Sequence, residues 1–380
     1  MSRKKSLLGL GAALTAAITV CTAGAAHADL APTLGDAVGV GSDTVQNIGN
    51  FLADGDNAGD TGYNSTGPKN RLVSFDATPD GNDRAGYLNG STTSSPLALN
   101  PTIVLRQGLQ PVQRPNGSGA GVGALIKDTA HNIDFVRMSR LPKVSEQNAA
   151  IAATGVGALR VIKISTDNLR LATATTTNAP ASLTPAQIVS IYQCNTTNWS
   201  AVGGTAGTIK PQIPQSGSGT GDTFRADLAT MNGGTAVTLG GCVSVGEEND
   251  PSVLRGDPNA IGPFSEGRKN LYDSGYFNDP TVTYGNTPVP LNSGIKLFAT
   301  SVYNNTRGLY IVFRNSDVSS GSKFQPGGAL NLIQDLFYNP LNVGGATPYV
   351  KSDAGIADIA AAGATPTYVD CGSGAGVTSC

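Results

Sequence analysis

The chain alternates short extended runs of apolar residues with segments in which apolar residues recur every three or four positions. Residues 36–41 read Asp-Ala-Val-Gly-Val-Gly and predict a strand, and the polar residues 42–44 can cap a helix that follows. In that helix Val45, Ile48 and Leu52 fall on one face. The sequence therefore predicts a unit of strand, tight turn and helix.

The same alternation continues along the chain. Extended apolar runs predict strands at residues 72–75, 102–105, 133–136, 158–164, 208–213, 258–265, 297–303 and 308–314. Helical spacing predicts helices at residues 120–128, 183–192, 225–231 and 329–338. The second of these helices has Thr184 as its N-cap and Pro185 at its first position. Strands that alternate with helices are typical of an α/β fold.

Three turns after predicted strands carry glycines or hydroxyl groups. Residues 215–224 read Gln-Ser-Gly-Ser-Gly-Thr-Gly-Asp-Thr-Phe and precede a helical run. Residues 114–126 hold a second Gly-Ser turn, and residues 137–142 place a serine and two arginines where a strand ends. Glycine lets the backbone approach a ligand closely, and a helix N-terminus aims N–H groups at an anion. The three turns therefore favour an anion site.

An ordinary loop is the competing interpretation of each turn. Glycine supplies 49 of the 380 residues, so Gly-Ser pairs arise by chance, and such clusters usually mark loops. Helix capping alone explains the hydroxyls at residues 42–44. The anion site is favoured because all three turns occur in one chain.

The first 28 residues have the pattern of a secretion signal. Arg3, Lys4 and Lys5 are followed by an apolar run, residues 7–20, and by Ala26-His27-Ala28. We expect cleavage near Ala28 and a secreted protein that begins at Asp29. The apolar run is shorter than the roughly 18 residues that a membrane-spanning helix needs. Cys21 leaves a lipoprotein anchor as an alternative, although Val20 precedes it where such signals have Gly or Ala.

Charge and cysteine content narrow the function classes. Removal of residues 1–28 takes away three positive charges and no negative one, so the formal net charge falls from −2 to −5. An acidic chain argues against nucleic acid as a partner. Four cysteines remain, and proximity favours disulfides between Cys194 and Cys242 and between Cys371 and Cys380, although three pairings are possible. A zinc site is disfavoured because the remaining chain has one histidine, His131, and no Cys-x-x-Cys.

The segments occur in the order seen in a known family. Residues 183–192, continued by Asn198-Trp199-Ser200, are similar to a helix and a Thr-Asn-Trp segment of the phosphate-binding receptors of ABC transporters, the PstS-like type II periplasmic binding proteins. Further matches are Gly217-Ser218-Gly219-Thr220 before Thr223-Phe224, Asn259-Ala260-Ile261-Gly262, and Asp134-Phe135 followed by Ser139. The resemblance covers nearly all of the chain after the signal.

The resemblance implies an α/β, two-lobed type II periplasmic-binding-protein fold with a hinge and an inter-lobe cleft. The 352 residues left after the signal also exceed what one hydrophobic core usually serves. We expect residues 29–162 and 264–380 in the first lobe and residues 163–263 in the second. The implied ligand is phosphate or a similar oxyanion, bound without a cofactor or metal, and an ABC permease is a possible partner. We expect a monomer.

The resemblance also assigns ligand contacts. The positions that match the family's three first-lobe turns and its second-lobe turn are Ser42, Thr44, Ser118, Gly119, Ser139, Ser218, Gly219 and Thr220. The sequence departs from the family at its charged positions. Pro214 and Ser216 stand where the family has an arginine and an aspartate, and Arg140 stands where an aspartate accepts the proton of phosphate. We therefore expect the cation to come from the first lobe, with Arg140, Arg137 or Arg114 as candidates.

Two other functions remain as alternatives. A secreted protein that keeps the fold for adhesion or scavenging is favoured by the poor lipoprotein signal. A hydrolase is less favoured because neither Ser118 nor Ser218 lies in a Gly-x-Ser-x-Gly elbow and His131 has no identifiable acidic partner. We therefore expect a binding protein without catalytic residues.

Overall fold

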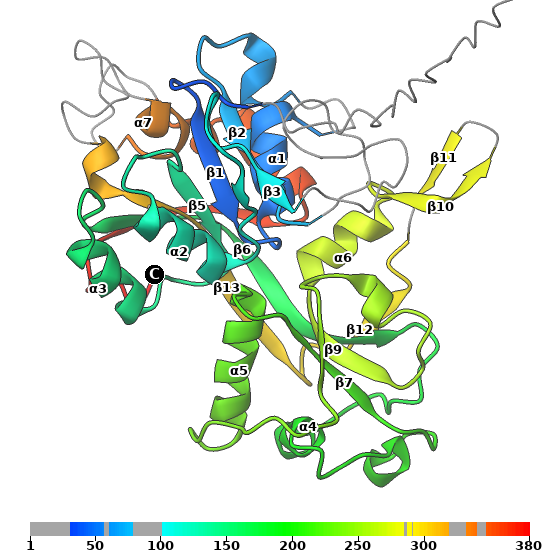
Figure 1. The fold of residues 1–380 in the computed structure, drawn as a ribbon. Helices are drawn as coiled ribbons and strands as arrows, with labels where there is room; N and C mark the ends of the chain where they lie inside the picture. Colours follow the sequence, from blue (N-terminus) through cyan, green and yellow to red (C-terminus); the bar gives the residue numbers. More distant parts are fainter. Residues whose placement is uncertain are drawn as a thin grey trace, which may run out of the picture.

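A computed structural model describes residues 31–56, 61–78, 101–284, 287–290, 292–318, 332–339 and 347–380. The predicted signal segment and Cys21 lie outside the described residues. The structure consists of two lobes that share long strands, so that the chain has an upper and a lower body joined at a waist (Figure 1). No helix in the described ranges is long and apolar enough to cross a membrane.

The first lobe is a sheet with helices on both faces. Its central strands are parallel neighbours in the order β2, β1, β5: β1 (Ala37–Gly41), β2 (Leu72–Ser74) and β5 (Phe135–Met138). Its helices are α1 (Gln46–Asp54), α2 (Ser118–Lys127), α3 (Val144–Ala152), α7 (Leu332–Phe337) and α8 (Asp353–Ala361). Neighbouring residues of β5 enter opposite cores: Phe135 packs with α1 and α7, whereas Val136 packs with α2. This alternation is what a sheet between two helix layers requires.

The second lobe has its own core. It is built from α4 (Pro185–Tyr192), β7 (Lys210–Pro214), α5 (Gly219–Met231), β8 (Ser244–Gly246) and β9 (Ala260–Ser265). Strand β7 lies parallel to both β8 and β9. Trp199, Tyr192 and Phe224 are fully buried in this core. The rings of Tyr192 and Phe224 meet edge to face, with their centroids 4.9 Å apart. The predicted α4 starts as expected, because Thr184 accepts a hydrogen bond from the backbone N–H of Gln187.

Two antiparallel strands run through both lobes. Strand β6 (Leu159–Ala174) pairs with β13 (Asn304–Arg314) over most of its length, and then with β9 on its other edge. Figure 1 shows both strands passing from the upper to the lower body. In their register Asp167 lies opposite Arg307, near the middle of the crossing. These strands therefore bring residues far apart in sequence to the waist.

The remaining described elements include two strands that pair with β6 and two separate two-stranded sheets. The other strands are β3 (Thr102–Ile103), β4 (Val112–Gln113), β10 (Asn278–Tyr284), β11 (Thr287–Pro290), β12 (Ile295–Leu297) and β14 (Thr365–Ser373). The remaining α-helix is α6 (Glu266–Asp273), and the 3₁₀ helices are η1 (Tyr63–Thr66), η2 (Trp199–Val202), η3 (Pro251–Val253), η4 (Asn315–Val318) and η6 (Tyr349–Lys351).

Several elements differ from the sequence predictions. The strand predicted at residues 158–164 continues to Ala174, because it crosses from one lobe to the other. The strand predicted at residues 297–303 is wrong: β12 ends at Leu297, and β13 begins only at Asn304. The sequence patterns did not predict α3, α6, α8 or β14. Part of the helix predicted at residues 329–338 lies outside the described residues, and α7 covers Leu332–Phe337.

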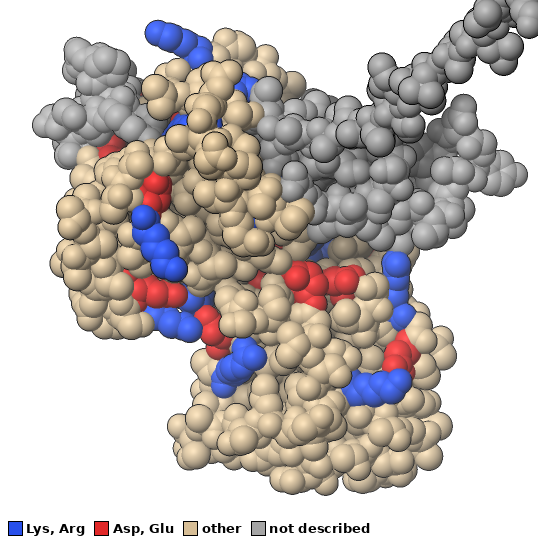
Figure 2. Space-filling view, viewed as in Figure 1, with Lys and Arg blue, Asp and Glu red and all other residues tan. Residues whose placement is uncertain are grey.

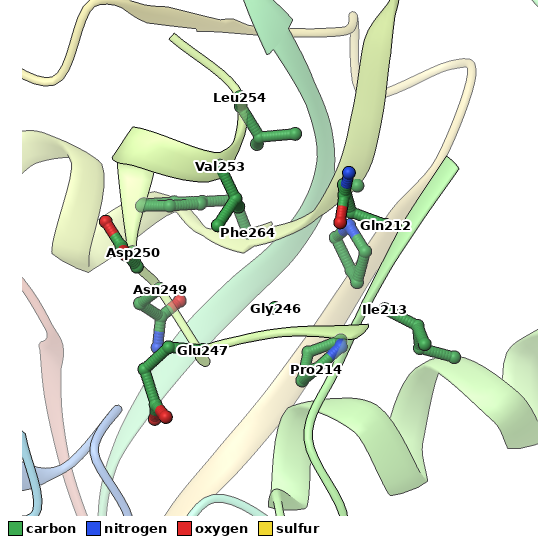
Figure 3. Close-up of a pocket in the computed structure, with 12 residues that line it drawn as sticks. Gln212, Ile213, Pro214, Gly246, Glu247, Asn249, Asp250, Val253, Leu254 and Phe264 are labelled. Atoms are coloured by element: carbon green, nitrogen blue, oxygen red, sulfur yellow. The ribbon is translucent and has the colours of Figure 1, made fainter. Parts of the chain in front are cut away.

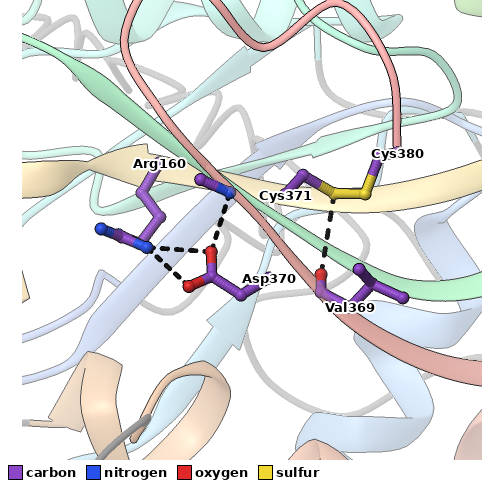
Figure 4. Close-up of a disulfide and its surroundings, with 6 residues drawn as sticks. Arg160, Val369, Asp370, Cys371 and Cys380 are labelled. Atoms are coloured by element: carbon purple, nitrogen blue, oxygen red, sulfur yellow. Dashed lines mark hydrogen bonds and ion pairs between the residues drawn. A yellow bond between two sulfur atoms is a disulfide. The ribbon is translucent and has the colours of Figure 1, made fainter.

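Both expected disulfide pairings are present. Cys194 and Cys242 join the end of α4 to the segment before β8, with Cα atoms 5.9 Å apart. Cys371 and Cys380 close the C-terminal segment onto β14, with Cα atoms 5.4 Å apart (Figure 4). On the same strand Asp370 forms an ion pair with Arg160 of β6 at 2.7 Å.

Candidate functional site

The three predicted first-lobe turns meet at one edge of the sheet. Strands β1 and β5 are parallel neighbours, so the turns after Gly41 and Met138 lie side by side. The Ser42 amide donates to the carbonyl of Arg137 at 2.9 Å, and Gly41 forms an isolated parallel bridge with Asn116, just before α2. The sheet therefore gathers three segments that are up to about a hundred residues apart in sequence, as parallel strands of an open α/β sheet do at their carboxyl ends.

Ser118 and Ser139 form a hydroxyl pair within this edge. Their Oγ atoms are 3.3 Å apart, and the Ser139 amide donates to Ser118 Oγ at 2.9 Å. Both side chains are fully buried. Ser118 is also the first residue of α2, where the backbone N–H groups have no partner within the helix. The pair can thus donate hydrogen bonds to a ligand that accepts them.

The second lobe brings the N-terminus of α5 to the same place. Ser218 caps this helix by accepting a hydrogen bond from the Gly221 amide at 2.9 Å, so its hydroxyl supports the turn itself. A Cβ atom on Gly219 would lie only 2.2 Å from Ser118 Oγ and 2.3 Å from Ser139 Oγ. The two lobes are therefore in contact, and only glycine fits at residue 219 in this arrangement.

Thr44 and Thr220 meet across the two lobes. Their Oγ1 atoms are 3.2 Å apart, and both side chains are buried. Thr44 follows β1, whereas Thr220 is in the first turn of α5. Of the residues predicted from the sequence, these two and the group Ser118, Ser139 and Gly219 come together at the interface between the lobes.

Arg307 supplies the buried cation of this site, and the sequence analysis did not identify it. It lies on the crossing strand β13, where it donates to Thr220 Oγ1 at 2.7 Å and to Thr44 Oγ1 at 3.4 Å. Its cross-strand neighbour Asp167 holds it in an ion pair at 3.0 Å. A guanidinium held by two hydrogen bonds to one carboxylate keeps a fixed orientation.

Glu248 is the second site residue that the sequence analysis missed. It follows β8, is 1% exposed, and accepts hydrogen bonds through Oε1 from Thr44 and from Thr220, the latter at 2.7 Å. Its other oxygen, Oε2, is buried without a hydrogen-bond partner among the described residues. Burying a carboxylate oxygen without a donor is costly. This oxygen is therefore placed to accept a hydrogen bond from a ligand.

A second buried ion pair borders the two threonines. Asn249 donates to Thr44 Oγ1 at 3.0 Å and to Asp43 at 2.9 Å. Asp43 also faces Arg268 of α6 at 3.4 Å. Asn249 has a φ of 55°, a conformation that asparagine adopts more readily than most residues. The hydrogen bond from Asn249 therefore adds a second partner that holds Thr44 in place.

The three arginines proposed from the sequence have other partners. Arg137 donates to Ser74 Oγ at 2.7 Å and to the Phe75 carbonyl at 2.6 Å, within the first lobe. Arg114 donates to the Asp76 carbonyl at 2.9 Å. Arg140 forms ion pairs at 2.7 Å with Glu146 and at 2.8 Å with Asp222. Its pKa is raised: burial lowers it, but Glu146 and Asp222 outweigh that effect.

Glu247 lies at the same interface and has an unusual pKa. Its Oε1 accepts hydrogen bonds from Asn116 of the first lobe at 2.9 Å and from Gln215 of the second at 2.7 Å. The pKa of Glu247 is raised to about 7, chiefly by burial and also by the charges of Asp43 and Glu248, against the lowering by the hydrogen bond from Asn116. It borders a cavity of about 10 Å³, large enough for about one water molecule (Figure 3).

His131 is outside this group of residues. Its Nε2 lies 2.7 Å from the Gly155 carbonyl, and its Nδ1 lies 3.5 Å from Asp317. No acidic partner of this histidine was identifiable from the sequence, and Asp317, 186 positions further along the chain, is brought near it by the fold. No group of three or more His, Cys, Asp or Glu side chains suited to a metal ion occurs in the part of the chain that the structure describes.

Comparison with known proteins identifies a family and a fold. The family model of the PBP superfamily domain matches residues 77–319. A structure described as a phosphate ABC transporter substrate-binding protein of Clostridium perfringens with bound phosphate is 17% identical, covers 87% of this chain and 100% of its own, and has a TM-score of 0.50. An ABC-type phosphate transport receptor of Vibrio cholerae is 16% identical over 87% of this chain and 100% of its own, with a TM-score of 0.46. The sequence has no match among the curated proteins.

Proposed function

The chain belongs to the PBP superfamily, and from that premise we propose that it is an exported solute-binding protein that closes its two lobes on a protonated oxyanion, with phosphate as the first candidate. One observation carries the proposal. Thr44 of the first lobe and Thr220 of the second meet beside the cation Arg307 and the carboxylate Glu248. Hydroxyls, one cation and one acceptor match a ligand that both accepts and donates hydrogen bonds.

Capture would combine fixed dipoles with one charge. The first turns of α2 and α5 present backbone N–H groups that have no partner within their helices, and such groups stabilise an anion without a full counter-charge. Arg307 adds the charge-assisted hydrogen bonds. Because Asp167 already orients the guanidinium, little side-chain entropy is lost when the ligand binds.

Glu248 would select the protonation state of the ligand. Hydrogen phosphate carries a proton that can be donated to Oε2, the oxygen that has no donor among the described residues. Sulfate carries none at neutral pH, so its oxygen would face a carboxylate oxygen with no proton between them. Like charges at that distance repel strongly in a buried site. The site therefore favours phosphate over sulfate.

Calorimetric titration of the protein with phosphate and sulfate, at about pH 6 and about pH 8, tests the proposal. We expect heat with phosphate and little or none with sulfate. Arg307→Lys should weaken phosphate binding by about 2 kcal/mol or more, roughly 30-fold, because a bidentate, oriented guanidinium is replaced by a point charge. Arg160→Lys, on the other crossing strand, is the matched control. The absence of any signal with both anions would contradict the function.

Two alternatives predict other outcomes. An adhesion or scavenging protein on the same scaffold would bind an anion but need no permease, so it should leave phosphate uptake unchanged when its gene is deleted. A hydrolase would release phosphate from a chromogenic phosphate ester. We also propose that the protein is exported, is a monomer and has an ABC permease as its partner. The structural likeness that supports the permease is to a protein described as a phosphate ABC transporter substrate-binding protein.

A further inference from the structure

Arg140 and Asp222 belong to a charged cluster where the two lobes meet. Arg140 follows β5 in the first lobe, and Asp222 is in the first turn of α5 in the second. Lys143 also contacts Asp222, at 2.9 Å. Figure 2 shows blue and red side chains next to one another at the waist between the two bodies. The cluster is distinct from Thr44, Thr220, Arg307 and Glu248.

Arg140 is held in place by contacts within the first lobe, and its contact with Asp222 is the one that joins it to the second lobe. Arg140 donates two hydrogen bonds to the carboxylate of Glu146, at 2.7 and 2.8 Å, and one to the Leu141 carbonyl. Glu146 also accepts from the Lys143 amide at the start of α3. The guanidinium is thus held in place before Asp222 reaches it. Its Nε then donates to Asp222 at 2.8 Å.

An ion pair between the lobes favours closure, because closure brings two helix ends of like charge together. The N-termini of α2 and α5 face each other, and the positive ends of two helix dipoles repel. The backbone offsets part of this, because the Gly119 amide donates to the Gly217 carbonyl at 2.9 Å. Asp222 places a negative charge in the first turn of α5, where it also favours the helix dipole.

We propose that Arg140, Lys143 and Asp222 form an electrostatic latch that holds the two lobes closed and sets how much of the ligand-free protein is closed. Arg140 is a positioning residue for closure, and it does not contact the ligand. The proposal rests on the two-lobed closure in the proposed function. The latch explains why Arg140 follows Ser139, because from this position its side chain reaches Asp222 of the second lobe.

The latch is partly exposed, so salt should act on it. The side chains of Arg140 and Asp222 are 10% and 24% exposed. Exposed ion pairs usually contribute little. Here Glu146 already orients Arg140, so little side-chain entropy is lost when Asp222 reaches it. Raising the ionic strength from about 0.1 M to about 1 M shortens the Debye length to about 3 Å and should open the ligand-free protein.

Distance measurements between spin labels test the latch without any anion. Labels are attached to exposed Ile151 in α3 and exposed Ala226 in α5 through a chemistry that does not use cysteine, because the described cysteines form disulfides. Asp222→Asn should lower the ratio of closed to open protein about fivefold, and Asp222→Lys should lower it further. The effect of Asp222→Asn should disappear at high salt.

Asp370→Asn is the matched control, because it breaks a pair of similar exposure within one lobe, Arg160 at 16% and Asp370 at 32%. It should leave the distances unchanged. Distances that are equal in the native protein, Asp222→Asn and Asp370→Asn would overturn the latch. Failure of anion binding, in contrast, would overturn the proposed function and leave this experiment interpretable.

Discussion

At the scale of single residues, the site depends on two charged side chains that lie on no glycine-rich turn. Arg307 is in the middle of a strand, and Glu248 follows a short strand at the edge of the sheet. Their importance comes from burial, since each charge is held by partners drawn from distant segments. In the proposed function, the Glu248 oxygen that has no hydrogen-bond donor among the described residues selects the protonation state of the ligand.

Replacement of Glu248 tests whether this carboxylate sets the preference for phosphate over sulfate. Glu248→Gln keeps an oxygen that can accept from Thr44 and Thr220 and turns the other acceptor into a donor. We expect phosphate affinity to fall and sulfate affinity to rise, each by about tenfold, because one hydrogen bond changes direction. Competition titrations with both anions measure this. An unchanged preference for phosphate over sulfate would mean that the ligand's proton is not donated to Glu248. Glu247→Gln is the control, because it removes a neighbouring negative charge.

At the scale of elements, the start of α5 has to fit against two serine hydroxyls. Alanine at residue 219 would favour the helix, but its Cβ would lie 2.2 Å from Ser118 Oγ when the lobes are closed. The same substitution therefore acts in opposite directions on helix stability and on closure.

Gly219→Ala should leave the melting temperature unchanged or raise it, and should weaken phosphate binding at least about tenfold, since overpacking costs about 1–3 kcal/mol. Gly123→Ala in α2 is the matched control, because a Cβ there would meet nothing within 4 Å. It should have the stabilising effect alone. Thermal unfolding and calorimetry on both variants measure the two effects, and normal affinity in Gly219→Ala would show that the serines move away without cost.

At the scale of the whole molecule, we expect closure to be coupled to protonation of Glu247. The residue is half-buried between Asn116 of one lobe and Gln215 of the other, and burial is the main cause that raises its pKa to about 7. A carboxyl whose pKa is raised on closure favours the closed state in its protonated form. The stabilisation of the closed state by this proton is complete when the pH is below 4.5, the ordinary pKa of a glutamate, and it is lost as the pH rises through about 7.

We therefore expect ligand-free protein to open between about pH 5 and about pH 8, measured by the same spin-label distances. Asp43 and Glu248, the charges that face Glu247, strengthen the effect. Glu247→Gln keeps the acceptor for Asn116 and should stay closed across this range. Phosphate must be absent, because it titrates in the same interval. An equal pH response in the variant would assign the effect to another group.

Local sequence determined those parts of this protein that depend on neighbouring residues. The strand that ends at Gly41, the α4 start at Thr184 and the Gly-Ser turns before α2 and α5 follow from spacing and turn chemistry. The cap predicted at residues 42–44 is wrong, because Val45 occupies the N-cap position of α1 and no side chain caps that helix. The resemblance to the phosphate-binding receptors assigned Thr44, Ser118, Ser139, Gly219 and Thr220 on these turns, and the fold brings them to one interface. The disulfide pairings followed from proximity along the chain.

Only the tertiary structure decided where the charges lie. Arg307 reaches Thr44 and Thr220 because β6 and β13 cross both lobes in a register that sets Asp167 beside it, and no local pattern encodes that register. Arg140 looked like the cation from its position after Ser139, but the closed lobes bring Asp222 to it. The partner of each arginine therefore depends on a long-range contact: strand pairing joins Arg307 to Asp167, 140 positions away, and lobe contact joins Arg140 to Asp222, 82 positions away.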